Sequence, residues 1–165
     1  MEEAPLNAMP LRILVDADAC PVKDEVYRVA TRYGAEVRVV SNAPLRVPES
    51  PLIKRILVSD TFDAADDWIV EEAERAAAAG IRIIVITGDI LLAERVPKTG
   101  AKVLAHNGKP FDGANIGAAI ATRAIMADLR AGMDGIGGGP PPFSKADRSR
   151  FLQALDTMLV SLRRP

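Results

Sequence analysis

The chain has 165 residues, of which 48% are hydrophobic, and its 21 Lys and Arg nearly balance its 22 Asp and Glu. This composition excludes disordered, collagenous and coiled-coil classes, because nearly half of the residues are available for a core and the net charge is only -1. A single cysteine, Cys20, and a single histidine, His106, exclude an internal disulfide and any intrachain site that needs several imidazoles. Any metal chemistry must therefore use carboxylates.

The chain ends and the charge balance predict the location and the type of partner. The first ten residues, MEEAPLNAMP, lack the basic flank and apolar run of a secretory signal, and the most apolar stretch, Ile81 to Ala93, is interrupted by charged residues and glycine. We expect a cytoplasmic protein with no membrane segment and no disulfide-linked partner. A sequence pI near 5.9 argues against strong nonspecific attraction to phosphate backbones. Aromatic residues, at 4%, predict few platforms for stacked bases.

In the first half of the chain, short β-branched runs alternate with longer helical patterns, as is typical of a parallel sheet covered on both faces. The predicted elements are strands at Leu11–Asp16, Val37–Val40 and Ile56–Val58, a helix from Pro21 to Gly34, and a helix from Asp60 or Thr61 through Ala79 to Gly80. Residues 42–51 contain three prolines, so we expect a loop there.

The second half begins with a strand at Ile81–Thr87, whose near-continuous apolar character suits a position inside the sheet. The elements expected after it are a short helix at Ile90–Val96, an edge strand at Lys102–Ala105, an Ala-rich helix at Ala114–Arg130 and an amphipathic helix through Leu162. Residues 132–142 contain five glycines and three prolines and connect the last two helices. Ser144 and Asp147 form a capping-box-like start of the final helix.

These elements predict one α/β domain of three layers, with a mostly parallel sheet of about five strands, over residues 11–165. Residues 1–10 are an N-terminal extension. The glycine- and proline-rich connection lies within the domain, because the 23 residues that follow it are too few for a second core.

Carboxylates gather where the predicted strands end. Asp16 and Asp18 follow the first strand, and Asp89 follows the strand at Ile81–Thr87. A third cluster after the third strand comprises Asp60, Asp63, Asp66 and Asp67. Ligands bind at the carboxyl ends of parallel strands, and close carboxylates there repel one another by about 1 kcal/mol or more per pair. Bound Mg²⁺ or Mn²⁺ would relieve this repulsion, and these ions also bind substrate phosphate oxygens. The carboxylates therefore predict metal-assisted cleavage of a phosphodiester or phosphomonoester.

Each aspartate also has a structural interpretation, because aspartate is common at helix N-caps and turns. Those that fit a capping role as well are Asp18, Asp60, Asp63 and Asp89. In the second helix, Asp66 borders the apolar stripe, whereas Asp67 faces solvent. Asp63 still reaches the rim of the sheet from the first turn.

Five ordered motifs together carry a specific resemblance. They are VDADACPVKDEVYRVA at 15–30, SNAPLRVP at 41–48, FDAADDWIV at 62–70, ITGDILLA at 86–93 and GGPPPFSKADRSRFLQALD at 138–156. Over about residues 11–160 the chain closely resembles the YaiI/YqxD family of uncharacterised bacterial proteins. That family is regarded as similar to PIN and NYN domains, α/β folds in which acids at strand ends bind Mg²⁺ or Mn²⁺ and cut RNA.

The resemblance implies a PIN-like fold, a ribonuclease activity and a set of site residues. Asp16 takes the place of the first-strand acid, Asp63 or Asp66 that of the middle-helix acid, and Asp89 that of the acid in the T-x-D motif. In the family pattern, Asp18 and Asn42 supply further oxygens, and Thr87 orients a metal-bound water or a phosphate. The implied cofactor is Mg²⁺ or Mn²⁺ and the implied partner is RNA.

Basic residues near the proline-rich loop have two interpretations. Arg46, Lys54 and Arg55 are candidates for contacts with a phosphate backbone, or they are solvated surface charges.

Two other functions remain open. Asp16-Ala-Asp18 after an apolar strand also resembles the first motif of haloacid dehalogenase phosphatases, whose first aspartate is a nucleophile, although Cys20 stands where that motif has Thr or Val. A noncatalytic RNA-binding or interaction module is the other alternative, since the balanced charge and the lack of a basic tail predict weak capture of nucleic acid. We interpret Cys20 as a packed thiol, His106 as a hydrogen-bonding loop residue and Trp68 as a core residue.

Overall fold

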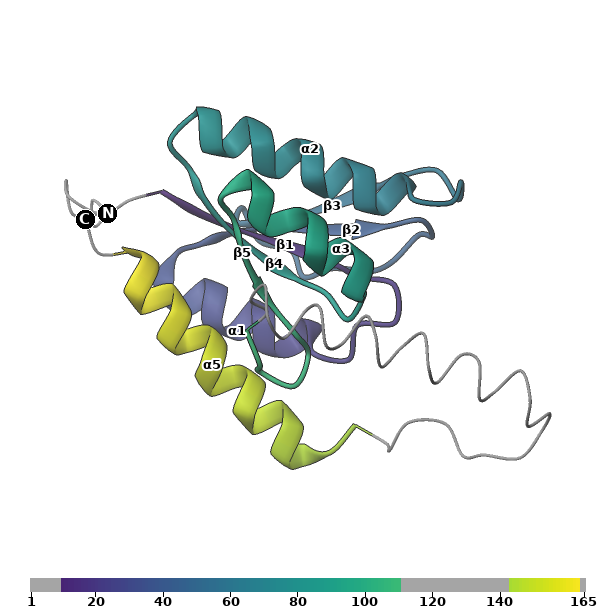
Figure 1. The fold of residues 1–165 in the computed structure, drawn as a ribbon. Coiled ribbons are helices and arrows are strands. Elements are labelled where there is room, and N and C mark those ends of the chain that lie inside the picture. The colour runs from purple at the N-terminus through teal and green to yellow at the C-terminus, as the bar shows by residue number, and fades with distance from the viewer. Residues whose placement is uncertain (1–9, 111–142, 164–165) are drawn as a thin grey trace, which may run out of the picture.

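The computed structural model describes residues 10–110 and 143–163 and contains a parallel sheet of five strands in the order β3-β2-β1-β4-β5. The strands are β1 (Leu11–Asp16), β2 (Glu36–Ser41), β3 (Ile53–Leu57), β4 (Arg82–Ile86) and β5 (Lys102–Leu104). The helices are α1 (Lys23–Tyr33), α2 (Ala64–Ala78), α3 (Ile90–Arg95) and α5 (Lys145–Arg163), with a 3₁₀ turn, η1 (Val96–Thr99), after α3. This architecture confirms the predicted α/β class (Figure 1).

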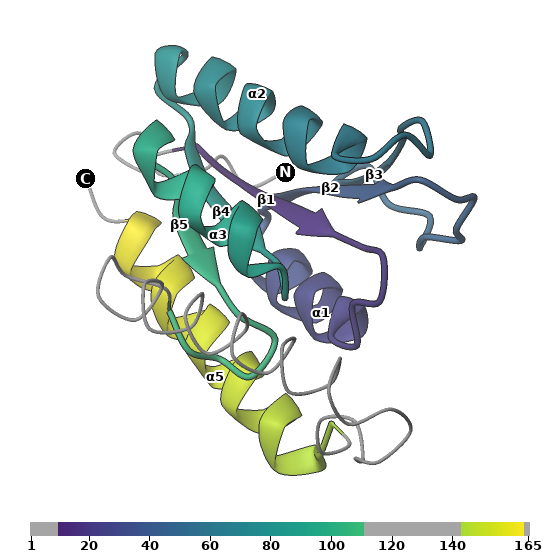
Figure 2. The same ribbon diagram turned by 45° about the vertical axis from the view of Figure 1, so that its right-hand side comes forward.

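Helices cover both faces of the sheet, as the two ribbon views show (Figures 1 and 2). α1 and α5 pack on one face, where Ile13 of β1 and Phe151 of α5 are fully buried. α2, α3 and η1 pack on the other face, where Leu14 of β1 and Ile69 of α2 are fully buried. Successive side chains of a strand point to opposite faces, so β1 contributes to both cores and forms the middle of a three-layer structure.

Most predicted elements lie close to their expected ranges, and β5 lies at the edge of the sheet as expected. β3 begins at Ile53 rather than at Ile56, because its first residues pair with β2 while Lys54 and Arg55 face solvent and break the apolar pattern. The helix expected at Ala114–Arg130, the connection at 132–142 and nearly all of the N-terminal extension lie outside the described residues.

The predicted cap of α2 is wrong. The chain makes a turn after Asp60, in which the N–H of Ala64 donates to the carbonyl oxygen of Thr61 at 3.1 Å. The helix therefore begins at Ala64, and Asp63 occupies the position before it with a left-handed backbone, φ 68°. Neither Asp60 nor Thr61 serves as the N-cap.

The capping box of α5 is confirmed. The N–H of Asp147 donates to Ser144 Oγ at 3.1 Å, and the N–H of Ser144 donates to Asp147 Oδ2 at 3.0 Å. The bond from the N–H of Ser144 to the carboxylate, followed by the bond from Arg150, lowers the pKa of Asp147. Among the described helices, none is long and apolar enough to cross a bilayer.

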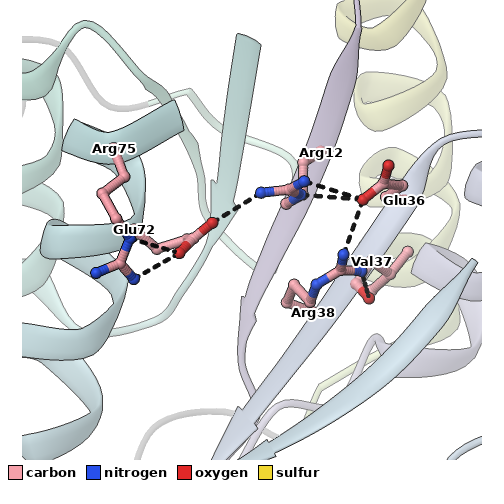
Figure 3. Close-up of polar contacts among 6 residues, drawn as sticks. All are labelled: Arg12, Glu36, Val37, Arg38, Glu72 and Arg75. Carbon is pink, nitrogen blue, oxygen red and sulfur yellow. Dashed lines mark hydrogen bonds and ion pairs between the residues drawn. The ribbon is translucent and has the colours of Figure 1, made fainter. Parts of the chain in front are cut away.

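A network of ion pairs lies at the amino end of the central strand (Figure 3). Arg12 of β1 contacts Glu36 of β2 at 3.1 Å and Glu72 of α2 at 2.7 Å. Glu36 is also bound by Arg38, and Glu72 by Arg75. Each of the two acids therefore contacts two arginines, and the network joins β1, β2 and α2. The side chains of Arg12 and Glu72 are largely buried, at 16% and 14% exposure.

Candidate metal-binding cleft

The strand order creates a crevice at the carboxyl end of the sheet. The chain lays β2 and β3 on one side of β1 and then returns to place β4 and β5 on the other. In such sheets the connections after the two central strands diverge and leave room for a ligand between them. An open cleft of about 750 Å³ lies at this point. Its polar and aromatic lining comprises Asp16, Asp18, Asn42, Asp60, Thr61, Phe62, Asp63, Asp66, Asp89 and His106.

The cleft brings together most of the residues expected from the sequence, and two of the expected residues lie elsewhere. The predicted acids and Asn42 are all in its lining, whereas Thr87 lies behind Asp16 and is fully buried. Arg46 is exposed in the β2–β3 loop and is not part of the lining, so its contact with substrate stays a prediction. Asp67 is exposed as expected and pairs with Arg95 at 2.9 Å.

A hydrogen-bond chain joins the ends of the two central strands. Thr87 Oγ1 donates to Asp16 Oδ2 at 2.8 Å and accepts from the N–H of Asp89 at 2.9 Å. Burial raises the pKa of Asp16, and the charges of Asp89 and Asp18 add to this rise, while the bond from Thr87 opposes it. Thr87 therefore orients the Asp16 carboxylate and ties its position to the turn that carries Asp89.

The capping interpretation holds for one aspartate of the cleft. Asp89 Oδ1 accepts from the N–H of Leu91 at 2.9 Å and caps α3. Asp63 holds the N-cap position of α2 without a side-chain capping bond. Asp18 instead accepts from the N–H of Asn42 at 3.3 Å, which links the loop after β1 to the loop after β2. Helix capping therefore does not explain why aspartate occupies positions 18 and 63.

The acids of the cleft lie close enough to affect one another. Burial, followed by the charges of Asp89, Asp16 and Asp63, raises the pKa of Asp66 to about 6, while Arg95 opposes the rise. Among the described residues, the lining contains no lysine or arginine. The two ends of the sheet therefore differ, because the acids of Figure 3 contact arginines, whereas in the cleft the charges of neighbouring acids help to raise the pKa of Asp16 and Asp66.

The oxygen donors of the cleft fit a hard divalent cation. Mg²⁺ and Mn²⁺ prefer carboxylate and amide oxygens, which Asp16, Asp66, Asp89 and Asn42 provide. In the part of the chain that the structure describes, no three His, Cys, Asp or Glu side chains converge tightly enough to enclose an ion by themselves. Mg²⁺ usually keeps several water ligands, so a site of this looser kind still suits it.

Sequence reasoning missed the position of His106. Its imidazole packs over Gly88, where a Cβ atom would lie only 2.9 Å from His106 Cε1. Nε2 is buried and makes no hydrogen bond among the described residues, and burial lowers the pKa of the ring, which favours the neutral imidazole. His106 follows β5, so the same reasoning about strand ends that identified the aspartates applies to it.

The structural interpretations of Cys20 and Trp68 are confirmed. Cys20 is buried, and burial raises the pKa of its thiol to about 11, as expected for a packed thiol rather than a nucleophile. Trp68 is half-buried against the core under α2. Neither residue lines the cleft.

Asp66→Asn is expected to stabilise the metal-free protein at neutral pH. Because the pKa of Asp66 is higher in the folded state than its usual 3.8, the folded state binds more protons between about pH 4 and 6, and this group makes the free energy of unfolding fall as pH rises through that window. The side chain is partly exposed, so the expected gain at pH 7.5 is roughly 1 kcal/mol.

Urea unfolding in EDTA from pH 4.5 to 7.5 measures this effect. The difference between variant and parent should shrink below about pH 5, where Asp66 of the parent becomes protonated. An equal difference at both ends of the range would show that the pKa of Asp66 is not raised in the folded state.

Fold and cleft together define a class of protein, an α/β domain with a carboxylate cluster at the switch point of a parallel sheet. The pattern of a known family, described as "Uncharacterized BCR, YaiI/YqxD family", matches residues 14–161. The chain belongs to this family.

Several relatives extend over nearly the whole chain. A "UPF0178 protein" of Sphingopyxis alaskensis is 69% identical over 152 residues, which is 92% of this chain and 95% of the relative. A "UPF0178 protein" of Jannaschia sp. is 55% identical over 152 residues, 92% of this chain and 94% of the relative. One of Rhodopseudomonas palustris strain BisB5 is 52% identical over 155 residues, 94% and 90% of the two chains. No solved structure matches the chain.

Proposed function

We propose that this protein is a nuclease that needs Mg²⁺ or Mn²⁺ and hydrolyses phosphodiester bonds of RNA at the carboxylate cleft. The observation that carries this proposal is that Asp16, Asp66 and Asp89 line one cleft at the switch point, where burial and then the charges of Asp89 and Asp16 raise the pKa of Asp66. A PIN-like relationship and a cytoplasmic location are part of the same proposal.

Electrostatics supports a metal-dependent reaction at this cleft. An anionic phosphate that approached these carboxylates alone would be repelled by them, and no lysine or arginine of the described lining would offset the repulsion. These acids could hold a divalent cation, which would offset part of their charge and offer a phosphate oxygen a positive partner. The raised pKa of Asp66 reflects its burial first and then the same repulsion.

The side chains have distinct tasks in this mechanism. Asp16 and Asp89 would hold the ion, with Asp66 or Asp63 completing the set and Asp18 and Asn42 supplying outer oxygens. Thr87 keeps Asp16 in one orientation through its 2.8 Å hydrogen bond. When bound, the ion supplies a water of lowered pKa and neutralises charge that develops on the phosphate. The carboxylates therefore need no histidine as general base.

A cleavage panel over single-stranded RNA, structured RNA and DNA tests the proposal. Purified protein should cut RNA with Mg²⁺ or Mn²⁺, lose all activity in EDTA, and show a melting temperature that rises as metal is added. Because metal competes with protons for Asp66, metal affinity should increase as pH rises through about 6.

The same panel separates the alternatives. Salt-dependent retention of RNA without cleavage would favour a noncatalytic RNA-binding module. A covalent aspartyl-phosphate trapped on Asp16 would favour the phosphatase alternative. A melting temperature that does not respond to either metal would contradict a metal site at the cleft.

A further inference from the structure

Phe62 is exposed at the edge of the cleft. Its side chain is 87% exposed, the highest value for a large apolar side chain in the described residues, and it lines the cleft with the acids. The other described aromatic residues, Tyr27, Tyr33, Trp68, Phe143 and Phe151, are all buried or half-buried. Exposing an aromatic ring to water gives up the stabilisation that its burial would bring, so packing does not explain the position of Phe62.

The backbone next to Phe62 is also unusual. Asp63 adopts a left-handed conformation, φ 68°, which is uncommon outside glycine although aspartate tolerates it better than most residues, and its side chain makes no capping bond. A hydrogen bond from Ala64 N–H to the Thr61 carbonyl oxygen closes the turn and leaves Phe62 within it. Two adjacent residues thus depart from what folding favours, and both line the cleft.

We propose that Phe62 is the platform on which one unpaired nucleobase of the substrate stacks, beside the phosphate held at the carboxylates. This inference rests on the proposed function and specifies which part of a nucleic acid the cleft recognises. Every base has a π-face, so stacking on one ring adds affinity with little dependence on sequence. It also compensates for a lining whose described residues include no lysine or arginine to bind the backbone.

The geometry favours a single strand over a duplex. A base in a helix is already stacked on its neighbours and must be unstacked to reach a protein ring, whereas a base in a loop or single strand is available. One exposed ring in the described residues corresponds to one stacked base, which agrees with the low aromatic content of the chain.

Binding of an oligoribonucleotide that contains one 2-aminopurine tests the inference. Stacking quenches the fluorescence of this base, so a titration in Ca²⁺ reports affinity and stacking without turnover. Phe62→Ala should weaken binding of the single strand about 5- to 150-fold and abolish the quenching, as expected for the loss of one stack. Phe62→Trp should restore both. In cleavage assays Phe62→Ala should raise KM and leave kcat nearly unchanged.

Val160→Ala is the matched control, because Val160 is an apolar side chain of α5 that is 36% exposed and lies outside the cleft lining. It should bind the oligonucleotide like the parent. Both truncations remove exposed groups, so the urea midpoints should stay close to that of the parent. A duplex of the same sequence should bind more weakly than the single strand, and a DNA version shows whether the sugar matters.

The outcomes separate this inference from the proposed function. If Phe62→Ala binds and cleaves like the parent, or if the parent does not quench the probe, the stacking inference is wrong. Metal-dependent cleavage that persists in Phe62→Ala would leave the nuclease proposal intact. If quenching depends on Phe62 but no RNA is cut with either metal, the stacking inference is supported and the nuclease proposal is wrong.

Discussion

Asp16→Asn is expected to reduce metal-dependent cleavage at least 100-fold and to remove the effect of metal on the melting temperature. Asparagine keeps the shape of the side chain and an oxygen that accepts the 2.8 Å bond from Thr87, so the turn after β4 stays in place. What is lost is one negative charge at the point where β1 ends. Losing about 3 kcal/mol of transition-state stabilisation from the bound ion corresponds to a rate loss of roughly 100-fold.

Asp16→Asn should lose nuclease activity without losing stability of the fold. Burial and neighbouring charges raise the pKa of Asp16, so removing its charge relieves repulsion in the metal-free protein. Urea unfolding in EDTA should therefore show a variant at least as stable as the parent. Activity is measured under single-turnover conditions with Mg²⁺ and Mn²⁺ in parallel.

Asp67→Asn is the matched control for this experiment. Asp67 follows Asp66 directly in α2, yet it is outside the cleft lining and pairs with Arg95 on the surface. The same chemical change there should leave cleavage within about threefold of the parent, since an exposed ion pair contributes at most about 1 kcal/mol. If the two variants lose activity equally, a general charge effect rather than a metal site would explain the result.

Among the glycines that the structure describes, Gly108→Ala is expected to cause the largest loss of stability, about 2 to 4 kcal/mol. Gly108 lies in the turn after β5 with φ 86°, which alanine adopts only at a cost of about 1–2 kcal/mol. A Cβ atom there would also lie 2.7 Å from the carbonyl oxygen of Arg150. That oxygen belongs to the backbone of α5 next to the fully buried Phe151, so the helix would have to move away from the sheet.

Gly80→Ala separates the conformational cost of a left-handed backbone from the cost of the steric clash with α5. Gly80 also has a left-handed backbone, φ 77°, but no atom beyond its two chain neighbours lies within 4 Å of the position of its added Cβ. It should therefore show the conformational cost alone and be 1–3 kcal/mol more stable than Gly108→Ala in urea unfolding at equal m-values. Equal losses in the two variants would show that the turn after β5 does not press against α5.

Local pattern was enough to predict most of the secondary structure. Gly34 ends α1 with a left-handed backbone, and Ser144 and Asp147 start α5, because these signals act within a few residues. The start of α2 was not predictable from neighbouring residues alone. Asp60, Thr61 and Asp63 are all good capping residues, and the turn that decides among them depends on the chain around it.

For the cleft, the rule that parallel strands end at one rim predicted which carboxylates meet, and the family resemblance selected the same acids. The bonds that orient them were not predictable, because Thr87 and Asp16 lie 71 residues apart and meet only when β4 pairs with β1. The places of His106 and Phe62 in the cleft lining were not predicted, because they depend on burial and exposure, which a residue type does not reveal.

By itself, the sequence determined the α/β class, the periodicity of the elements and the placement of acids after strands, because each of these depends on neighbouring residues and on the balance of apolar and charged side chains. The tertiary structure decided the order of the strands, and with it the contrast between an amino end where acids contact arginines and a carboxyl end where several acids line one cleft. Charge interactions depend on distance in space, and folding alone sets that distance.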